Sequence, residues 1–276
     1  MKTAMLMALM TMLLMAIGDY FGGLQGMTIM LVFGVAMNFF TYWNSDKMVL
    51  AHYGAQEVNA RTAPRLYGIV KRLADRAKLP MPKVYIIDSP VPNAFATGRN
   101  PEHAAVAVNT ALADLLDEDE LAGVLAHELS HVKHRDILIS TVAASMAGAI
   151  STIAQWGMFL GGGRDENGES RNPFATILVM ILAPLAAALI QMAVSRSREY
   201  MADKSGGELC GDPNALADAL LKIEAFARRR VMPGATEATA HMFIINPFSG
   251  VNMRQLFSTH PPTEERVRLL REQARA

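Results

Sequence analysis

Four stretches of the chain contain no Asp, Glu, Lys or Arg, and they dominate its pattern of hydrophobic and polar residues. Three of them reach the roughly 20 residues that a helix needs to cross a bilayer, and the first is marginal. Lys2 ahead of the first apolar run also suits a signal peptide, but no convincing cleavage site follows it, so an uncleaved helix is favoured. The pattern therefore predicts four transmembrane helices, over residues 3–18, 20–45, 139–163 and 172–195.

The loops between these helices, and the basic residues around them, predict their arrangement. Residues 19–26 join the first two helices into a hairpin, and the Gly-rich residues 161–173 join the last two. Lys and Arg follow the second stretch, precede the third and follow the fourth, whereas the first loop has none. Arg164 and Arg171 in the second loop are offset by three acidic residues and oppose this assignment only weakly. By the positive-inside rule, the polar part of the chain and both termini are cytoplasmic.

The two hairpins, residues 1–45 and 139–195, divide the polar sequence into two segments. These segments are residues 46–138 and 196–276, and we expect them to pack together as one domain.

Within the first polar segment, the sequence predicts a helix and a small sheet. Residues 56–77 have a helical pattern, and residues 83–88 and 104–109 are rich in Val, Ile, Tyr and Ala and read as strands. We therefore expect a mainly α fold with a small β-sheet, of the α+β class.

A further helix follows the second strand and has a clear start. Asp117 can cap it with Glu120 at the third position, and the acidic first turn suits the positive end of the helix dipole. Five apolar residues then share one face, which should be buried: Leu121, Val124, Leu125, Leu129 and Val132.

This helix carries the sequence His127-Glu128-Leu129-Ser130-His131, the HExxH pattern of zinc hydrolases. Positions i and i+4 lie on one face of a helix, so both imidazoles can bind one Zn²⁺. Glu128 lies about 100° round the helix and can hold the water that attacks a substrate. The spacing indicates a metallopeptidase.

A catalytic zinc ion keeps three protein ligands, so a third is needed. His134 is about 10 Å along the helix from His127, which is too far, and no glycine follows His131 closely enough to turn the chain back. Glu199, directly after the fourth membrane helix, is a better candidate, and Asp203 one turn later could accept the other ring N–H of a ligand histidine. The spacing fits equally well an amphipathic helix whose acids balance neighbouring basic residues.

Composition gives no sign of a nucleic-acid partner and excludes zinc sites built from cysteines. The chain has 276 residues, 26 of them basic and 26 acidic, and this balance gives no indication of a nucleic-acid partner. Cys210 is the single cysteine, so neither an intrachain disulfide nor a cysteine zinc cluster can form.

Four motifs together resemble the HtpX family of membrane-bound zinc metalloproteases, heat-shock proteases related to the CAAX prenyl endopeptidases. The motifs are HELSH at 127–131, SREYMAD at 197–203, NAFATG at 93–98 and STHPPTEER at 258–266. The resemblance implies a gluzincin core, in which His127, His131 and Glu199 bind one zinc ion and Glu128 is catalytic. It also implies a multi-pass protein of the cell inner membrane that cleaves misfolded or damaged membrane proteins at the cytoplasmic side in the stress response.

Two further groups are candidates for contact with the substrate. His260 could stabilise the oxyanion with Arg266 as its partner, although His-Pro-Pro also suits a rigid turn before the last helix. Asn93, Ala94 and Phe95 could form an edge strand that pairs with an extended peptide.

The predicted metal ligands lie close to the predicted membrane helices along the chain. His131 and Glu199 are each within about 12 Å of the membrane boundary at helical rise, so the lipid bilayer and membrane proteins are expected partners. An intramembrane site-two-type protease also uses HExxH, but the charged residues just after His131 argue against burial in the bilayer. A non-catalytic adaptor with a structural zinc site would leave Glu128 without a role. Whether residues 232–253 form a lid stays open.

Overall fold

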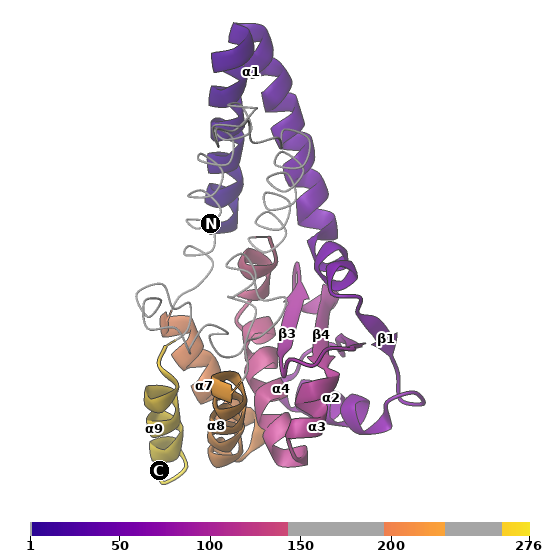
Figure 1. Cartoon of the computed structure of the whole chain (residues 1–276), viewed down its shortest axis with the longest axis vertical. Helices are drawn as coiled ribbons and strands as arrows, with labels where there is room; N and C mark the ends of the chain where they lie inside the picture. Colours follow the sequence, from indigo (N-terminus) through magenta and orange to yellow (C-terminus); the bar gives the residue numbers. More distant parts are fainter. Residues whose placement is uncertain (1, 143–195, 230–260) are drawn as a thin grey trace, which may run out of the picture.

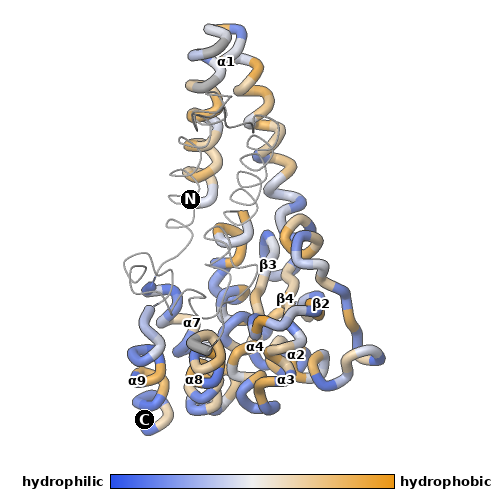
Figure 2. Tube along the Cα trace, viewed as in Figure 1, coloured by the Kyte–Doolittle hydropathy of each residue, from blue (hydrophilic) through white to orange (hydrophobic). Residues whose placement is uncertain are grey.

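The structure, a computed structural model, describes residues 2–142, 196–229 and 261–276. A long helical hairpin stands on a domain of helices and one small sheet (Figure 1). The hairpin is largely apolar along its length, whereas the domain below it mixes polar and apolar residues (Figure 2). The predicted third and fourth membrane helices lie outside the described residues apart from a first helical turn at residues 137–142.

The hairpin is the element α1 (Lys2–His52), which reverses its direction at Gly23. Gly23 has φ 55° and ψ −147°, a conformation that glycine adopts readily. The two arms approach so closely that a Cβ atom on Gly18 would lie 2.4 Å from the carbonyl oxygen of Gly26. The prediction of a loop over residues 19–26 is therefore wrong, because one glycine turns the chain and small residues let the helical arms meet.

Both arms of α1 are suited to a bilayer. Residues Thr3–Tyr20 and Gly22–His52 are long and apolar enough to cross a membrane, and little of the apolar stretch in the second arm is buried. Asn38 Nδ2 links the arms, donating to Met7 O at 3.0 Å and to Thr11 Oγ1 at 2.8 Å. Such hydrogen bonds between helices suit a surrounding that has no water to compete for them.

The sheet has four strands in the order β1-β2-β4-β3. The strands β2 (Lys83–Ile87) and β4 (Ala104–Asn109) are parallel, while β1 (Gln56–Val58) and β3 (Ala94–Gly98) pair antiparallel at the two edges. The strands predicted over residues 83–88 and 104–109 are confirmed. The central strand β4 is buried at all six residues, as expected of an inner strand.

The helix predicted over residues 56–77 is correct only in its second part, where α2 spans Pro64–Ala77. A turn at Asn59, whose Oδ1 accepts from Arg61 N at 2.9 Å, separates α2 from β1. Pro64 lies at the first helical turn, where its missing N–H costs nothing, and it disfavours a helical conformation for the residue before it. Gln56 and its neighbours instead pair with β2, which an analysis of periodicity alone could not show.

The remaining helices surround α4 (Glu118–Lys133), which follows the short elements η1 (Pro101–His103) and α3 (Thr110–Leu115). Helices α7 (Arg196–Cys210), α8 (Pro213–Arg229) and α2 pack against α4, and α9 (Thr263–Gln273) packs on α7 and α8. The capping box is confirmed: Asp117 Oδ1 accepts from Glu120 N, and Glu120 Oε2 accepts from Asp117 N, both at 3.0 Å. The predicted apolar face of this helix is fully buried in the main core.

Candidate metal centre

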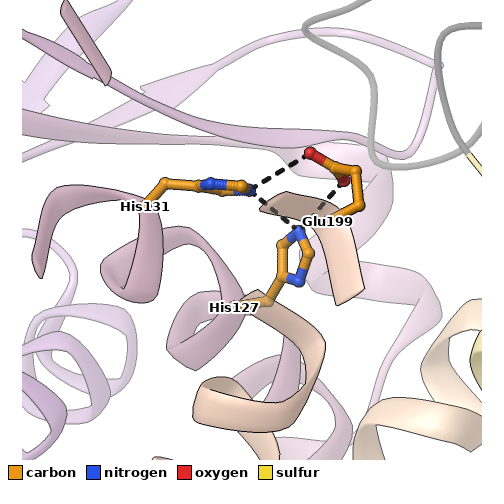
Figure 3. A group of neighbouring side chains, drawn as sticks. All are labelled: His127, His131 and Glu199. Carbon is orange, nitrogen blue, oxygen red and sulfur yellow. Dashed lines mark hydrogen bonds and ion pairs between the residues drawn. The ribbon is translucent and has the colours of Figure 1, made fainter. Parts of the chain in front are cut away.

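Two helices bring three potential metal ligands to one point. His127 and His131 lie on successive turns of α4, and Glu199 reaches them from the first turn of α7 (Figure 3). His127 Nε2 lies 3.3 Å from His131 Nε2 and 3.7 Å from Glu199 Oε2, while His131 Nε2 lies 3.5 Å from Glu199 Oε1. In the part of the chain that the structure describes, these three side chains lie close enough together to share a metal ion.

The spacing of the two imidazole nitrogens fits a tetrahedral ion. Ligand bonds of about 2.0–2.1 Å in a tetrahedron place the ligand atoms roughly 3.3–3.4 Å apart. The two imidazole nitrogens, 3.3 Å apart, match this value, and the Glu199 carboxylate faces both of them, with Oε2 3.7 Å from His127 Nε2 and Oε1 3.5 Å from His131 Nε2. Two imidazole nitrogens and one carboxylate are also the donor set of catalytic zinc sites, which keep a fourth position for water.

A buried carboxylate orients the first histidine. His127 Nδ1 lies 2.9 Å from Asp203 Oδ1, so a proton on Nδ1 leaves the Nε2 lone pair directed at the metal position. Asp203 in turn accepts two hydrogen bonds from Arg266, from Nε and from Nη2, each 2.7 Å long. Burial alone would raise the pKa of Asp203, but the Arg266 guanidinium and the His127 ring lower it to about 2. Asp203 is therefore a carboxylate throughout the physiological pH range.

The second histidine has carboxylates on several sides. Burial lowers the pKa of His131, but the Asp136 carboxylate, followed by the charges of Glu199 and Glu128, raises it to about 9. These surroundings favour a cation at the ring, whether a proton or a metal ion.

Glu128 points from the motif helix toward the sheet. Its Oε2 accepts a hydrogen bond of 3.0 Å from the backbone N–H of Ala96 in β3, and its side chain is buried. The carboxylate thus lies between the metal ligands of its own helix and the edge strand.

The geometry of β3 shows which of its groups face outward. Asn109 N donates to Asn93 O at 2.9 Å, so the odd-numbered residues Asn93 and Phe95 direct their main-chain groups toward β4. Ala94 and Ala96 alternate with them and direct their main-chain groups away from β4, to the side on which no strand of the described residues pairs with β3. The Phe95 side chain is buried against Tyr53, with ring centroids 5.5 Å apart. Of the three predicted substrate contacts, Ala94 is therefore the one whose main chain points away from β4.

The other predicted residues have separate places. His134 is the C-cap of α4 and does not join the three-ligand group, in agreement with its exclusion on helix length. Arg266, the predicted partner of His260, lies buried against Asp203. His260 and residues 232–253 lie outside the described residues.

Sequence reasoning missed the glycine that lets α7 approach α4. A Cβ atom on Gly206 would lie 2.9 Å from the backbone N and Cα of His127, so the two helix backbones nearly touch beside the first ligand. The signal was present in the pair Gly206-Gly207, because glycine inside a helix is costly and needs a packing reason.

A histidine pair on one helix, a glutamate from a second helix and a neighbouring carboxylate are the arrangement of a metallopeptidase site. The chain belongs to peptidase family M48, whose family model matches residues 60–274.

Curated relatives match nearly the whole chain. The "Protease HtpX homolog" of Methylibium petroleiphilum is 61% identical over 269 residues, which cover 97% of this chain and 95% of the relative. The "Protease HtpX homolog" of Burkholderia thailandensis is 59% identical over 276 residues, covering 99% and 96%. The crystal structure of S. mikatae Ste24p has a similar fold, with a TM-score of 0.53 at 18% identity. That match covers 94% of this chain and 62% of the Ste24p chain.

These relationships confirm the predicted resemblance to the HtpX proteases. The protein is a membrane metallopeptidase that acts on proteins. They also decide against the site-two-type protease and against the non-catalytic adaptor.

Proposed function

We propose that the protein is a zinc-dependent endopeptidase that cleaves misfolded or damaged membrane proteins at the cytoplasmic face of the cell inner membrane. The observation that carries the proposal is the convergence of His127, His131 and Glu199, with ligand atoms within 4.8 Å of one another, at the helix that also carries Glu128. In this proposal the three residues hold one Zn²⁺ per chain. When bound there, zinc would polarise the scissile carbonyl and make a water molecule more acidic.

Glu128 is the proposed general base and acid. It takes the proton of the attacking water and passes it to the nitrogen of the leaving peptide, so no covalent intermediate is needed. Its hydrogen bond to Ala96 N holds the carboxylate between the ligands and the edge strand. His260 stays our candidate for the donor that stabilises the developing oxyanion.

The substrate is proposed to pair with β3. On the side away from β4, this strand directs the main chain of Ala94 and Ala96 toward Glu128, whose carboxylate now accepts from Ala96 N, and an extended peptide can add to this edge as a further strand. Asn93 and Phe95 would act indirectly, because they attach β3 to β4 and to the core. Pairing through the main chain tolerates many side chains, which suits a protease that acts on unfolded proteins.

The proposed topology has four transmembrane helices. Residues 1–45 and 139–195 form the two hairpins, and residues 46–138 and 196–276 form the cytoplasmic peptidase domain with both termini. The apolar, exposed α1 hairpin and the basic residues that follow it support this arrangement.

The deciding experiment compares Glu128→Gln with the wild-type protein purified in detergent. We expect both forms to contain about one zinc ion per chain by metal analysis, while the variant cuts an unfolded protein at least 10²-fold more slowly. Glu102→Gln, at an exposed position of η1, is the matched control and should cut at the wild-type rate. Equal cleavage by Glu128→Gln, or a wild-type protein that binds no zinc, would refute the mechanism.

A companion variant tests the third ligand. Glu199→Ala should lose most of its zinc in dialysis that leaves the wild-type protein loaded. Full zinc occupancy of this variant would remove Glu199 from the ligand set.

A further inference from the structure

Behind the second histidine lies a carboxylate that is paired with an arginine, on the side of the ring opposite the metal position. We propose that Asp136 is the positioning residue for His131 and that Arg198 holds Asp136 in place. The inference rests on the proposed metal site. It gives each histidine ligand its own chain of arginine, aspartate and imidazole.

The end of α4 brings Asp136 back beside the motif. Asp136 N donates to His131 O at 2.9 Å, and Arg135 N donates to Val132 O at 3.1 Å. Arg135 has φ 59°, so this is a Schellman turn with a left-handed residue after the C-cap. The turn stops the helix two residues after His131 and returns the chain toward that residue. Asp136 reaches the ring because of this turn, which no helical periodicity predicts.

The side-chain contacts continue from Asp136 in both directions. Asp136 Oδ2 lies 3.7 Å from His131 Nδ1, and Asp136 Oδ1 lies 3.6 Å from Arg198 Nη1. All three side chains are largely buried, with exposed fractions of 14–18%. Asp136 and Arg198 form an ion pair, and the Asp136 carboxylate faces the Nδ1 side of the His131 ring from just beyond hydrogen-bonding distance. The burial of these groups limits screening by solvent.

The same order of groups lies behind the first histidine. Arg266, Asp203 and His127 are in direct hydrogen-bonding range, at 2.7 and 2.9 Å, and are almost fully buried. The group at His131 is the more open and looser counterpart. A carboxylate at Nδ1 of each ring would fix the proton on that nitrogen, direct the Nε2 lone pair at the metal and raise the basicity of the ligand.

Arg198 also links this group to the third ligand. It precedes Glu199 in the first turn of α7, so one turn supplies both a metal ligand and the cation that holds Asp136. The first turn of α7 therefore meets α4 at the metal position and the turn after α4 at the Asp136 carboxylate.

The test measures zinc affinity rather than activity. The full-length protein in detergent is titrated with zinc against a chelator of known affinity, for the wild type and for Asp136→Asn. Loss of a carboxylate behind a ligand histidine lowers metal affinity about 10- to 100-fold, and we expect a loss in this range. Asp114→Asn, exposed on α3, removes the same charge and should bind zinc like the wild type.

Two readouts separate positioning from a general structural role. The zinc-free Asp136→Asn protein should melt at a somewhat lower temperature than the zinc-free wild type, because its ion pair with Arg198 is lost, but its unfolding transition should stay cooperative. In the cobalt-substituted protein, the visible absorption bands should shift, because the His131 ring is no longer oriented. Wild-type zinc affinity in Asp136→Asn, or cobalt absorption bands identical to those of the wild type, would overturn the inference.

A double variant tests the role of Arg198. Arg198→Met should weaken zinc binding, and the combination with Asp136→Asn should be no weaker than Asp136→Asn alone, since both changes act through one carboxylate. Losses that multiply would show that Arg198 acts elsewhere. If the wild-type protein itself bound no zinc, the proposed function would fail; if only the Asp136 variants behaved like the wild type, this inference alone would fail.

Discussion

Arg266 and Asp203 show how single residues of this protein combine structural and functional roles. The guanidinium donates two hydrogen bonds of 2.7 Å to a carboxylate that also faces His127, and both side chains are almost fully buried. A buried pair of this kind adds modestly to stability as a whole, but removing one partner leaves an uncompensated charge. Loss of either residue should therefore destabilise the fold and disturb the metal site together.

Replacing Arg266 by alanine should lower the free energy of unfolding by about 3–5 kcal/mol, because Asp203 stays buried and charged. The measurement is denaturant or thermal unfolding of the zinc-free protein in detergent. Arg268→Ala on the same helix removes exposed ion pairs with Glu265 and Glu272 and should cost under about 1 kcal/mol. Equal costs for the two variants would contradict the importance assigned to the buried pair.

At the scale of elements, the contact between α4 and α7 determines whether the site exists. Gly206 lets the two helices approach at His127, and Gly123 does the same for α4 and α8, where an added Cβ would lie 2.9 Å from Leu216 N and Cα. Because backbone rather than a flexible side chain is in the way, the helices would have to move apart. Such a movement would carry Glu199 and Asp203 away from their partners.

We expect Gly206→Ala to destabilise the protein by about 1–3 kcal/mol through overpacking and to weaken zinc binding. Gly68→Ala is the matched control, since Gly68 is exposed in α2 and an added Cβ meets no atom within 4 Å. That change should stabilise the protein by about 0.5–1 kcal/mol, because alanine is the better helix former. Unfolding curves and zinc titrations of both variants check the opposite signs; a neutral Gly206→Ala would contradict the close contact.

At the scale of the whole molecule, the edge strand β3 is attached to segments that lead to the membrane. Arg99, just after β3, lies over the ring of Trp43 in α1, 4.6 Å from the ring centroid. At the end of β3, Gly98 N donates to Thr141 Oγ1 at 3.3 Å, and the Thr97 hydroxyl also contacts it at 3.0 Å. The strand β3, which is proposed to pair with the substrate, is thereby held between the base of the hairpin and the start of the predicted third membrane helix.

The proposed topology predicts where cysteines introduced in a Cys210→Ser background can be labelled. Glu102→Cys in the peptidase domain should react with an impermeant maleimide in inverted inner-membrane vesicles and not in spheroplasts. Leu24→Cys, at the exposed tip of the hairpin, should show the reverse pattern. Labelling of both positions from the same side would contradict the transmembrane hairpin.

The sequence by itself determined the features that depend on neighbours along the chain. The capping box at Asp117, the two inner strands and the placement of both histidines on one helical face follow from local patterns and are confirmed. The motif resemblance correctly indicated the family.

Only the tertiary structure decided the features that join distant parts of the chain. Spacing could not choose between a ligand and a surface acid at Glu199, because its approach to His131 depends on the packing of α7 and on Gly206. The pairing of Arg266 with Asp203 spans 63 residues, and the return of Asp136 needs a left-handed turn at Arg135. Periodicity records which face of an element is buried, whereas these contacts depend on which elements meet and how closely their backbones approach.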